Sequence, residues 1–434
     1  MLGERAGTLS SMAATAQSVA EVCTEARAAS LALARLDTAT KDAALEAMAL
    51  ALTDRSEEIL EANARDVEAG AQAGLTPALV DRLTLTEQRL EGMAADVLAI
   101  RALAVPVGET IDGRRLESGL DLRRVRVPLG VVAVVYEARP NVTIDCSALC
   151  LKSGNAIVLR GSSMAAHSNA VLASVARGAL VAAGIPDAAI SPVCGGDRDE
   201  LAQIATQEGL IDLVIPRGGE GLKAALTEHA TVPVMYAASG NCHVYVDATA
   251  HLDDAVAIAL NAKVQRPGVC NAMETLLVHA DVAPAFLPRV LSELRESGVE
   301  LRVDGRARSL AGPMADTLGV ADEEDWATEY LALICAVRVV DSVEDAIEHV
   351  NRYGSGHSEA ILTGSTDAAR AFTAGVDAAC VYVNASTRFT DGGVFGMGAE
   401  IGNSTQKLHA RGPIGLRELT TYRYVIEGSG QVRP

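Results

Sequence analysis

Apolar residues in the first hundred positions recur at the three-to-four spacing of helices that bury one face. One such face consists of Leu45, Met48, Ala49 and Leu52. Helix breaks and caps are expected at Asp54, Ser56, Thr76-Pro77 and Thr84. The pattern therefore predicts a helical region from about Met12 to Leu103.

Charged and apolar residues alternate from Glu109 to Arg126, around Asp112-Gly113 and Ser118-Gly119. Asp-Gly between alternating runs is a hairpin signal, so this segment is expected to form an exposed β-ribbon. The strand-like tail Leu419–Ile426 has no helix after it. We expect the ribbon and the tail to mediate oligomerisation.

Continuous apolar, β-branched runs follow the ribbon and are typical of parallel strands buried on both faces. These strands are predicted at Val131–Tyr136, Ala156–Leu159 and Asp212–Ile215, with helices at Ser168–Ala183 and Gly221–Glu228. A second set is predicted near and beyond Ala248, with a helix at Asp253–Val264 and strands at Thr275–His279, Leu333–Val340 and Ala379–Val383. Strands that alternate with helices of this length indicate a doubly wound α/β fold.

Composition narrows the class of function. The chain has 434 residues, a size at which two or three compact units are expected. A formal net charge of -19 argues against nucleic acid as a partner, although a local pocket can still bind a phosphate-bearing small molecule. The eight cysteines form no Cys-x-x-Cys pair and no zinc-like spacing, and no apolar run approaches a membrane span. We therefore expect a cytoplasmic protein without a metal site.

The stretch Arg266-Pro-Gly-Val-Cys270-Asn-Ala-Met-Glu-Thr places one cysteine behind a rigid Pro-Gly turn, between a predicted helix and a predicted strand. Backbone N–H donors at such a junction can keep the cysteine as thiolate, the form that attacks a carbonyl carbon. A buried structural cysteine is the alternative reading of Cys270.

Two further loops have the composition of anion sites at the start of a helix. Arg160-Gly161-Ser162-Ser163 follows one predicted strand, and Pro216-Arg217-Gly218-Gly219-Glu-Gly221 follows another. Backbone N–H groups at a helix N-terminus favour phosphate, and glycine lets the backbone approach a pyrophosphate closely. Ordinary strand-to-helix turns remain the alternative for both loops.

Together with Tyr136-Glu-Ala-Arg-Pro-Asn141 and the two loops, the Cys270 stretch resembles the aldehyde dehydrogenase superfamily, and most closely its gamma-glutamyl phosphate reductase branch. The resemblance covers nearly the whole chain. Other matching segments are Glu61–Asp66, Tyr353–His357, Asn384–Arg388, Gly398–Gly402 and His409–Pro413. It implies a Rossmann-type cofactor domain (1–108 and 129–247), an α/β catalytic domain (248–412) and an oligomerisation ribbon (109–128 and 413–434).

The resemblance also implies an activity: NADPH-dependent reduction of L-glutamate 5-phosphate to L-glutamate 5-semialdehyde and phosphate, a step of proline biosynthesis. Cys270 would form a thioester with the substrate, and Asn141 would join the Cys270 N–H in stabilising the oxyanion. A homo-oligomer, dimer or tetramer, is expected. Whether a glutamate 5-kinase hands over the acyl phosphate in a transient complex is left open.

Cofactor contacts are implied for Arg160, Gly161, Ser162, Ser163, Arg217, Gly218, Gly219 and Glu329. Ser163 stands where many family members have an acidic residue that binds the adenosine ribose. Loss of the carboxylate leaves room for a 2′-phosphate, with which Arg160 can pair, so NADP(H) is expected. Substrate contacts are implied for Glu137, Arg139, His357 and Arg388.

Ala237 stands where hydrolytic aldehyde dehydrogenases have the glutamate that activates water. Its absence suits an enzyme that must not hydrolyse its own thioester. Three rival functions stay open at this point: an aldehyde dehydrogenase with another acyl donor, a cofactor-free thiol acyltransferase or hydrolase, and a non-catalytic binding module. The second would need a histidine base beside Cys270, and neither His243 nor His357 lies in a recognisable Cys–His arrangement.

Overall fold

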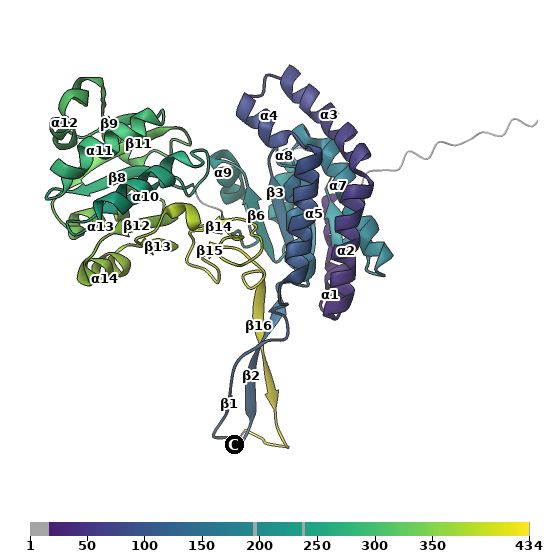
Figure 1. Cartoon of the computed structure of the whole chain (residues 1–434). Coiled ribbons are helices and arrows are strands. Elements are labelled where there is room, and N and C mark those ends of the chain that lie inside the picture. Colours follow the sequence, from purple (N-terminus) through teal and green to yellow (C-terminus); the bar gives the residue numbers. More distant parts are fainter. Residues whose placement is uncertain (1–16, 194–197, 237–238, 434) are drawn as a thin grey trace, which may run out of the picture.

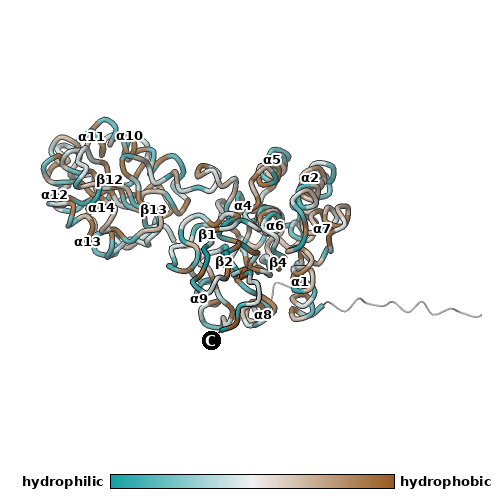
Figure 2. The backbone as a smooth tube through the Cα atoms, turned by 90° about the horizontal axis from the view of Figure 1, so that it is seen from below, coloured by the Kyte–Doolittle hydropathy of each residue, from teal (hydrophilic) through white to brown (hydrophobic). Residues whose placement is uncertain are grey.

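Two parallel sheets and one antiparallel ribbon organise the protein, as the computed structural model shows for residues 17–193, 198–236 and 239–433 (Figure 1). The first sheet and its helices form one part, the second sheet and its helices form another, and the ribbon extends away from both. In Figure 2 hydrophobic stretches run inside the two sheet-containing parts, and hydrophilic stretches are frequent on their outer helices.

The chain starts with a helical layer, as predicted, although Met12 and its neighbours up to residue 16 lie outside the described residues. Its helices are α1 (Val19–Leu33), α2 (Thr38–Asp54), α3 (Ser56–Gln72), α4 (Pro77–Leu83) and α5 (Glu87–Ala102). Side chains cap most of them: Ser18 and Glu21 form a reciprocal capping box on α1, and Thr86 accepts from the Arg89 N–H on α5. Helices α2–α5 pack on one another, α2 and α3 also pack on α7, and α1 packs against the first sheet.

The first sheet has four parallel strands in the order β5-β4-β3-β6. Its strands are β3 (Val131–Tyr136), β4 (Ala156–Gly161), β5 (Ile190–Pro192) and β6 (Leu213–Arg217). The helices between them are α6 (Asn141–Lys152), α7 (Ala166–Ala182), α8 (Arg198–Ala205) and α9 (Glu220–His229). All six residues of β3 are buried, as its unbroken apolar run predicted.

The second sheet has seven parallel strands in the order β10-β9-β11-β8-β7-β12-β13. Its strands are β7 (Cys242–Val246), β8 (Met273–His279), β9 (Glu300–Val303), β10 (Gly319–Val320), β11 (Ile334–Val340), β12 (Ser358–Leu362) and β13 (Cys380–Val383). The helices are α10 (Leu252–Val264), α11 (Ala283–Glu296), α12 (Gly305–Leu310), α13 (Val343–Tyr353) and α14 (Thr366–Gly375). The prediction of a doubly wound α/β fold is confirmed.

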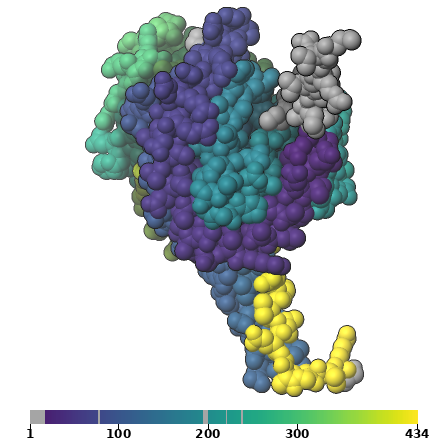
Figure 3. All heavy atoms as spheres, turned by 90° about the vertical axis from the view of Figure 1, so that its right-hand side faces the viewer, coloured from purple at the N-terminus to yellow at the C-terminus, as the bar shows by residue number. Residues whose placement is uncertain are grey.

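The ribbon consists of β1 (Thr110–Arg115), β2 (Asp121–Pro128) and β16 (Thr420–Glu427), so the C-terminal tail pairs with the hairpin of its own chain. Figure 3 shows it projecting from the rest of the molecule. The predicted hairpin is confirmed, but its turn lies at Ser118-Gly119, where Gly119 has a positive φ of 82°. Asp112-Gly113, the other expected turn, lies within β1, because its neighbours continue the ladder with β2. The ribbon's part in oligomerisation stays a prediction.

Two short strands, β14 (Asn403–Ser404) and β15 (Gly412–Pro413), pair near the end of the chain. Among the helices that the structure describes, none combines the length and apolar character that crossing a membrane requires.

Candidate active site

Cys270 lies in a turn between the end of α10 and the start of β8, as the sequence predicted. Asn271 anchors this turn, because its Nδ2 donates to the Thr390 carbonyl at 2.7 Å and its own carbonyl accepts from Thr387 Oγ1 at 2.7 Å. Cys270 is partly exposed, whereas the other cysteines among the described residues are buried. It is therefore the described thiol that a substrate can reach.

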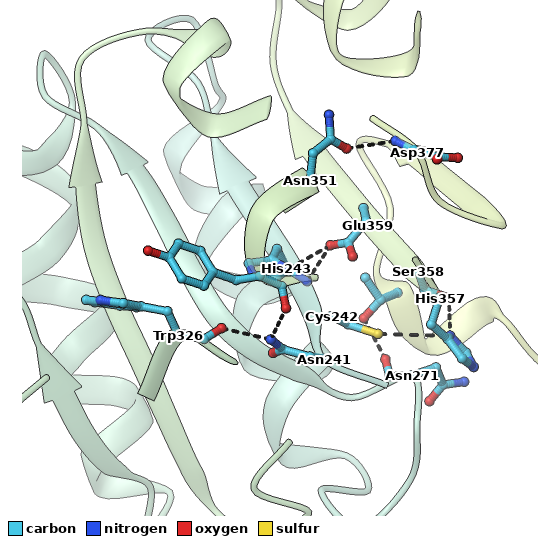
Figure 4. Close-up of polar contacts among 12 residues, drawn as sticks. Asn241, Cys242, His243, Asn271, Trp326, Asn351, His357, Ser358, Glu359 and Asp377 are labelled. Atoms are coloured by element: carbon cyan, nitrogen blue, oxygen red, sulfur yellow. Dashed lines mark hydrogen bonds and ion pairs between the residues drawn. The ribbon is translucent and has the colours of Figure 1, made fainter. Parts of the chain in front are cut away.

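The other side of the turn packs against the segment before β7. A β-carbon on Gly240 would fall 1.4 Å from the Cys270 carbonyl oxygen, so only glycine fits there. The same carbonyl accepts from the Cys242 thiol at 3.2 Å, and Figure 4 shows Cys242 between Asn271 and His357. The cysteine turn is thus fixed through its backbone from both sides.

The ionisation of Cys270 differs from the sequence-based expectation. Burial raises the pKa of its thiol, and the nearby carboxylates Glu400 and Glu329 raise it further. Arg217 and the cysteine's own backbone N–H oppose these effects without overcoming them. The expected thiolate is therefore not the favoured form here, because desolvation outweighs the stabilising donors.

Two guanidinium groups stand at the carboxyl ends of β3 and β6, on the side of Cys270. Arg217 ends β6 beside Tyr136, and Arg139 follows β3 by three residues. Each is half-buried, and neither side chain has a hydrogen bond or ion pair with another described residue. Burial and then the charge of Arg217 lower the pKa of Arg139 to about 10. Both cations are thus placed to meet an anionic substrate or cofactor.

Asn141 begins α6, directly after the turn that ends β3. Its Nδ2 donates to Asp145 Oδ2 at 2.8 Å, one helical turn further on. Asp145 was not predicted as a site residue, although its spacing of four residues from Asn141 places both on one helix face.

The loop Arg160–Ser163 follows from β4, and its residues Gly161, Ser162 and Ser163 line a pocket of about 110 Å³ with Tyr136 and Pro192. Within it the Ser162 hydroxyl is buried and has no hydrogen-bond partner. Arg160 Nε lies 4.0 Å from Glu200 Oε2, so an acidic side chain already faces this arginine. A pocket with an unpartnered hydroxyl at the start of a helical segment fits the ribose of a dinucleotide.

The segment Glu61–Asp66 supports this pocket from α3. Asp66 accepts from the Ser168 N–H at 2.7 Å and from its hydroxyl at 2.6 Å, and so caps the start of α7. Asn63 donates to Ser168 Oγ at 3.1 Å. The segment is therefore structural and fixes the helix next to the pocket.

The loop after β6 contacts Glu137, one of the predicted substrate residues. Glu137 Oε2 accepts from the Gly219 N–H at 3.3 Å, and a β-carbon on Gly218 would lie 2.7 Å from its carboxyl carbon. Glu137 thus lies against the proposed pyrophosphate loop, whose glycines leave space for it. Glu329 likewise has a protein partner, since it accepts from the Gly240 N–H at 2.6 Å.

His357 was predicted to contact substrate, but the structure places it in the interior. It is fully buried, its Nδ1 pairs with Ser358 Oγ at 2.8 Å, and burial lowers its pKa to about 4. Figure 4 shows it beside Cys242, whose sulfur lies 4.0 Å from its Nδ1. Arg388 stands nearer the expected position: its Nε donates to Gln265 at 2.8 Å, and its charge interacts with Cys270.

Ala237 lies outside the described residues, so its prediction rests on sequence alone.

Known proteins match this chain over nearly its whole length. The sequence model of the aldehyde dehydrogenase family matches residues 5–328 and 317–425. The chain is 54% identical over 415 residues to a gamma-glutamyl phosphate reductase of Thermobifida fusca, covering 96% of this chain and 98% of that protein. It is 56% identical over 408 residues to a protein of the same name from Moorella thermoacetica, covering 94% and 97%.

A crystal structure of gamma-glutamyl phosphate reductase from Thermotoga maritima superposes with a TM-score of 0.93 at 47% identity, over 96% of this chain and 100% of that one. The resemblance found in the sequence is confirmed at the level of whole chains. The chain therefore belongs to the aldehyde dehydrogenase family and, within it, to the gamma-glutamyl phosphate reductases.

Proposed function

We propose that this protein reduces L-glutamate 5-phosphate to L-glutamate 5-semialdehyde and inorganic phosphate with NADPH, in proline biosynthesis. The observation that carries the proposal is Cys270: a partly exposed cysteine in a backbone-anchored turn that faces the cations Arg139 and Arg217. An acyl phosphate brings both the electrophilic carbon and the negative charge that such a site suits.

In this mechanism the Cys270 thiol first gives up its proton to solvent, because burial disfavours the resting thiolate, and the sulfur then attacks the acyl carbon and forms a C–S bond. The Asn141 amide and the Cys270 N–H stabilise the oxyanion, a kind of donor worth about 3–4 kcal/mol of barrier. The C–O bond to phosphate then breaks, and phosphate leaves with the bonding electron pair. Arg139 and Arg217 offset the charge of the leaving group.

NADPH, when bound, supplies the hydride that reduces the resulting thioester. The thiohemiacetal then collapses, breaking the C–S bond, and releases the aldehyde and the thiol. Ala237 offers no carboxylate to activate water, which keeps the thioester for reduction.

The pocket at Arg160–Ser163 and the loop Arg217–Gly219 would hold the cofactor. Ser163 carries no charge, so it does not repel a 2′-phosphate, and this favours NADPH over NADH. Glu329 would hold the nicotinamide-side ribose. Its carboxylate accepts a hydrogen bond from the Gly240 N–H, and the ribose hydroxyl groups would replace that donor or bind beside it.

We further propose that residues 1–108 and 129–247 bind the dinucleotide and residues 248–412 carry the catalytic cysteine. The ribbon of 109–128 and 413–434 would join copies of the chain into a homo-oligomer. Exposed apolar side chains on β16 support this: Tyr422, Tyr424 and Ile426 are each about half exposed.

A panel of aldehydes tests the proposal in the oxidative direction. With phosphate and NADP+, glutamate 5-semialdehyde should give a kcat/KM at least about 100-fold above that of acetaldehyde, propionaldehyde or succinate semialdehyde. NAD+ should be a poorer acceptor than NADP+. An equal or higher kcat/KM for another aldehyde would assign the chain to a different acyl donor.

A further inference from the structure

Asp145 holds the amide of Asn141 from within the same helix. The two residues are four positions apart on α6, and Asn141 Nδ2 donates to Asp145 Oδ2 at 2.8 Å. The other carboxylate oxygen, Oδ1, is buried and has no hydrogen-bond partner. A buried carboxylate with one unpaired oxygen lowers the stability of the fold. Its presence in the interior is therefore better explained by a function than by stability.

The chemistry of the pair fixes which end of the amide faces Asp145. A carboxylate only accepts hydrogen bonds, so it selects the NH₂ end of Asn141 and excludes the carbonyl end. The Nδ2 group has two N–H bonds, and the structure shows a partner for one of them among the described residues. The second N–H is left for a ligand.

Arg217 connects this pair to the cysteine. Its guanidinium acts electrostatically on both Asp145 and Cys270, which places the helix start and the cysteine turn around the same cation. Asp145, which holds the Asn141 amide, and Cys270 therefore both lie within the electrostatic reach of Arg217.

We propose that Asp145 is a positioning residue, which keeps the Asn141 amide turned so that an N–H rather than the carbonyl oxygen faces the oxyanion formed at Cys270. This inference rests on the proposed function, because it assigns Asn141 its role in that reaction.

Protonation of Asp145 would remove its preference for the NH₂ end of the Asn141 amide. A neutral carboxyl group can donate to the amide oxygen, so a flipped Asn141 becomes possible and would present a carbonyl to the oxyanion. Burial raises the pKa of Asp145 to about 7; Asp96 on α5 raises it as well, while Asn141 and Arg217 lower it. The wild-type kcat should therefore fall as the pH drops below about 7.

A double-mutant cycle on Asn141 and Asp145 tests the proposal. The kcat of phosphate-dependent NADP+ reduction with glutamate semialdehyde is measured at pH 8 for wild type, Asn141→Ala, Asp145→Asn and the double variant. Asn141→Ala should lower kcat by about 100- to 1000-fold. Asp145→Asn should lower it by about 10- to 100-fold with the Kd for NADP+ unchanged, because an amide at 145 accepts or donates and no longer selects one orientation.

In the Asn141→Ala background, adding Asp145→Asn should change kcat by less than about twofold, since there is no amide left to orient. Asp145→Asn should also remove the part of the kcat loss below neutral pH that protonation of Asp145 causes, and leave the steady decline that protonation of the Cys270 thiol imposes on both proteins. Asp42→Asn is the matched control: it breaks the Asp42–Lys152 ion pair at the other end of α6 and should leave kcat near wild type.

Equal loss from Asp145→Asn in both backgrounds, or a loss as large from Asp42→Asn, would overturn the inference and show a merely structural role. Near-normal kcat in Asn141→Ala would overturn it together with the proposed role of Asn141. Failure of the proposed function itself is distinguishable, because wild type would then show no phosphate-dependent reaction at all.

Discussion

Gly240 and Cys270 touch through their backbones: a β-carbon on Gly240 would lie 1.4 Å from the Cys270 carbonyl oxygen and 2.5 Å from its Cα. The Gly240 N–H at the same time donates to Glu329 at 2.6 Å. One glycine therefore couples the nucleophile to the carboxylate that we expect to hold the cofactor ribose.

Gly240→Ala should lower kcat by at least about 100-fold, because the alanine methyl group would displace the cysteine turn and a 1 Å misplacement costs about that much. Gly178→Ala is the control, since a β-carbon there meets no atom within 4 Å. Steady-state kinetics of both variants check the prediction. A Gly240→Ala protein with wild-type kcat would show that the turn tolerates the shift.

Ser163→Glu should weaken NADPH binding relative to NADH binding by on the order of 1–3 kcal/mol, through repulsion between the carboxylate and the 2′-phosphate. Ser163→Ala removes the hydroxyl without adding charge and should affect both cofactors alike. Titration of each cofactor against each variant gives the dissociation constants. The same loss for both cofactors in Ser163→Glu would mean that residue 163 does not face the 2′ position.

Much of this fold could be predicted from the sequence, because buried strands and helices have recognisable patterns of apolar residues. The unbroken apolar run of β3 marked a central parallel strand, and the Pro-Gly turn before Cys270 marked a helix-to-strand junction. Asp112-Gly113 was wrongly predicted as a turn, because turn-forming residues also occur inside exposed strands. Only the pairing with β2 shows that these two residues lie in a strand.

The predictions for the site were less complete, since they depended on contacts between distant segments. The family resemblance implied a substrate contact for His357, but packing against Cys242 buries it. The approach of Gly240 to Cys270 joins residues 30 positions apart and has no local signal. The ionisation of Cys270 follows from desolvation, which the sequence does not report.

Lys263 and Glu274 form an ion pair at 2.5 Å with both side chains fully buried, one on each side of the Cys270 turn. Lys263→Met should destabilise the fold by about 3–5 kcal/mol, because it leaves a buried carboxylate without its partner. Replacing both residues, as Lys263→Met with Glu274→Leu, should recover most of the loss. Arg289→Met, which breaks an exposed pair with Asp253, should cost at most about 1 kcal/mol. Urea denaturation measures all four proteins, and a small effect of Lys263→Met alone would contradict the argument.

Asp145 should make stability depend on pH in a defined direction. Its pKa is raised by burial to about 7 in the folded state and is about 3.9 when unfolded. Between these values the folded state binds the proton more tightly, so this group's contribution to stability is lost as the pH rises through the window. Asp145→Asn should therefore match wild type near pH 4 and be more stable at pH 8, by up to about 4 kcal/mol. Equal pH dependence of the two proteins in denaturant titrations would show that Asp145 has an ordinary pKa.

The central claim is that Cys270 forms an acyl-enzyme, which reacts with phosphate and not with water. The requirement for phosphate in the oxidative direction tests this claim most directly. With glutamate semialdehyde and NADP+ but no phosphate, the protein should make at most about one NADPH per active site and keep an acyl adduct on Cys270, detectable by intact mass. Added phosphate should start steady turnover, and Cys270→Ala should show neither burst nor turnover, while Cys150→Ala and Cys335→Ala should retain both. A wild-type steady rate that is independent of phosphate, with free glutamate as product, would contradict the account.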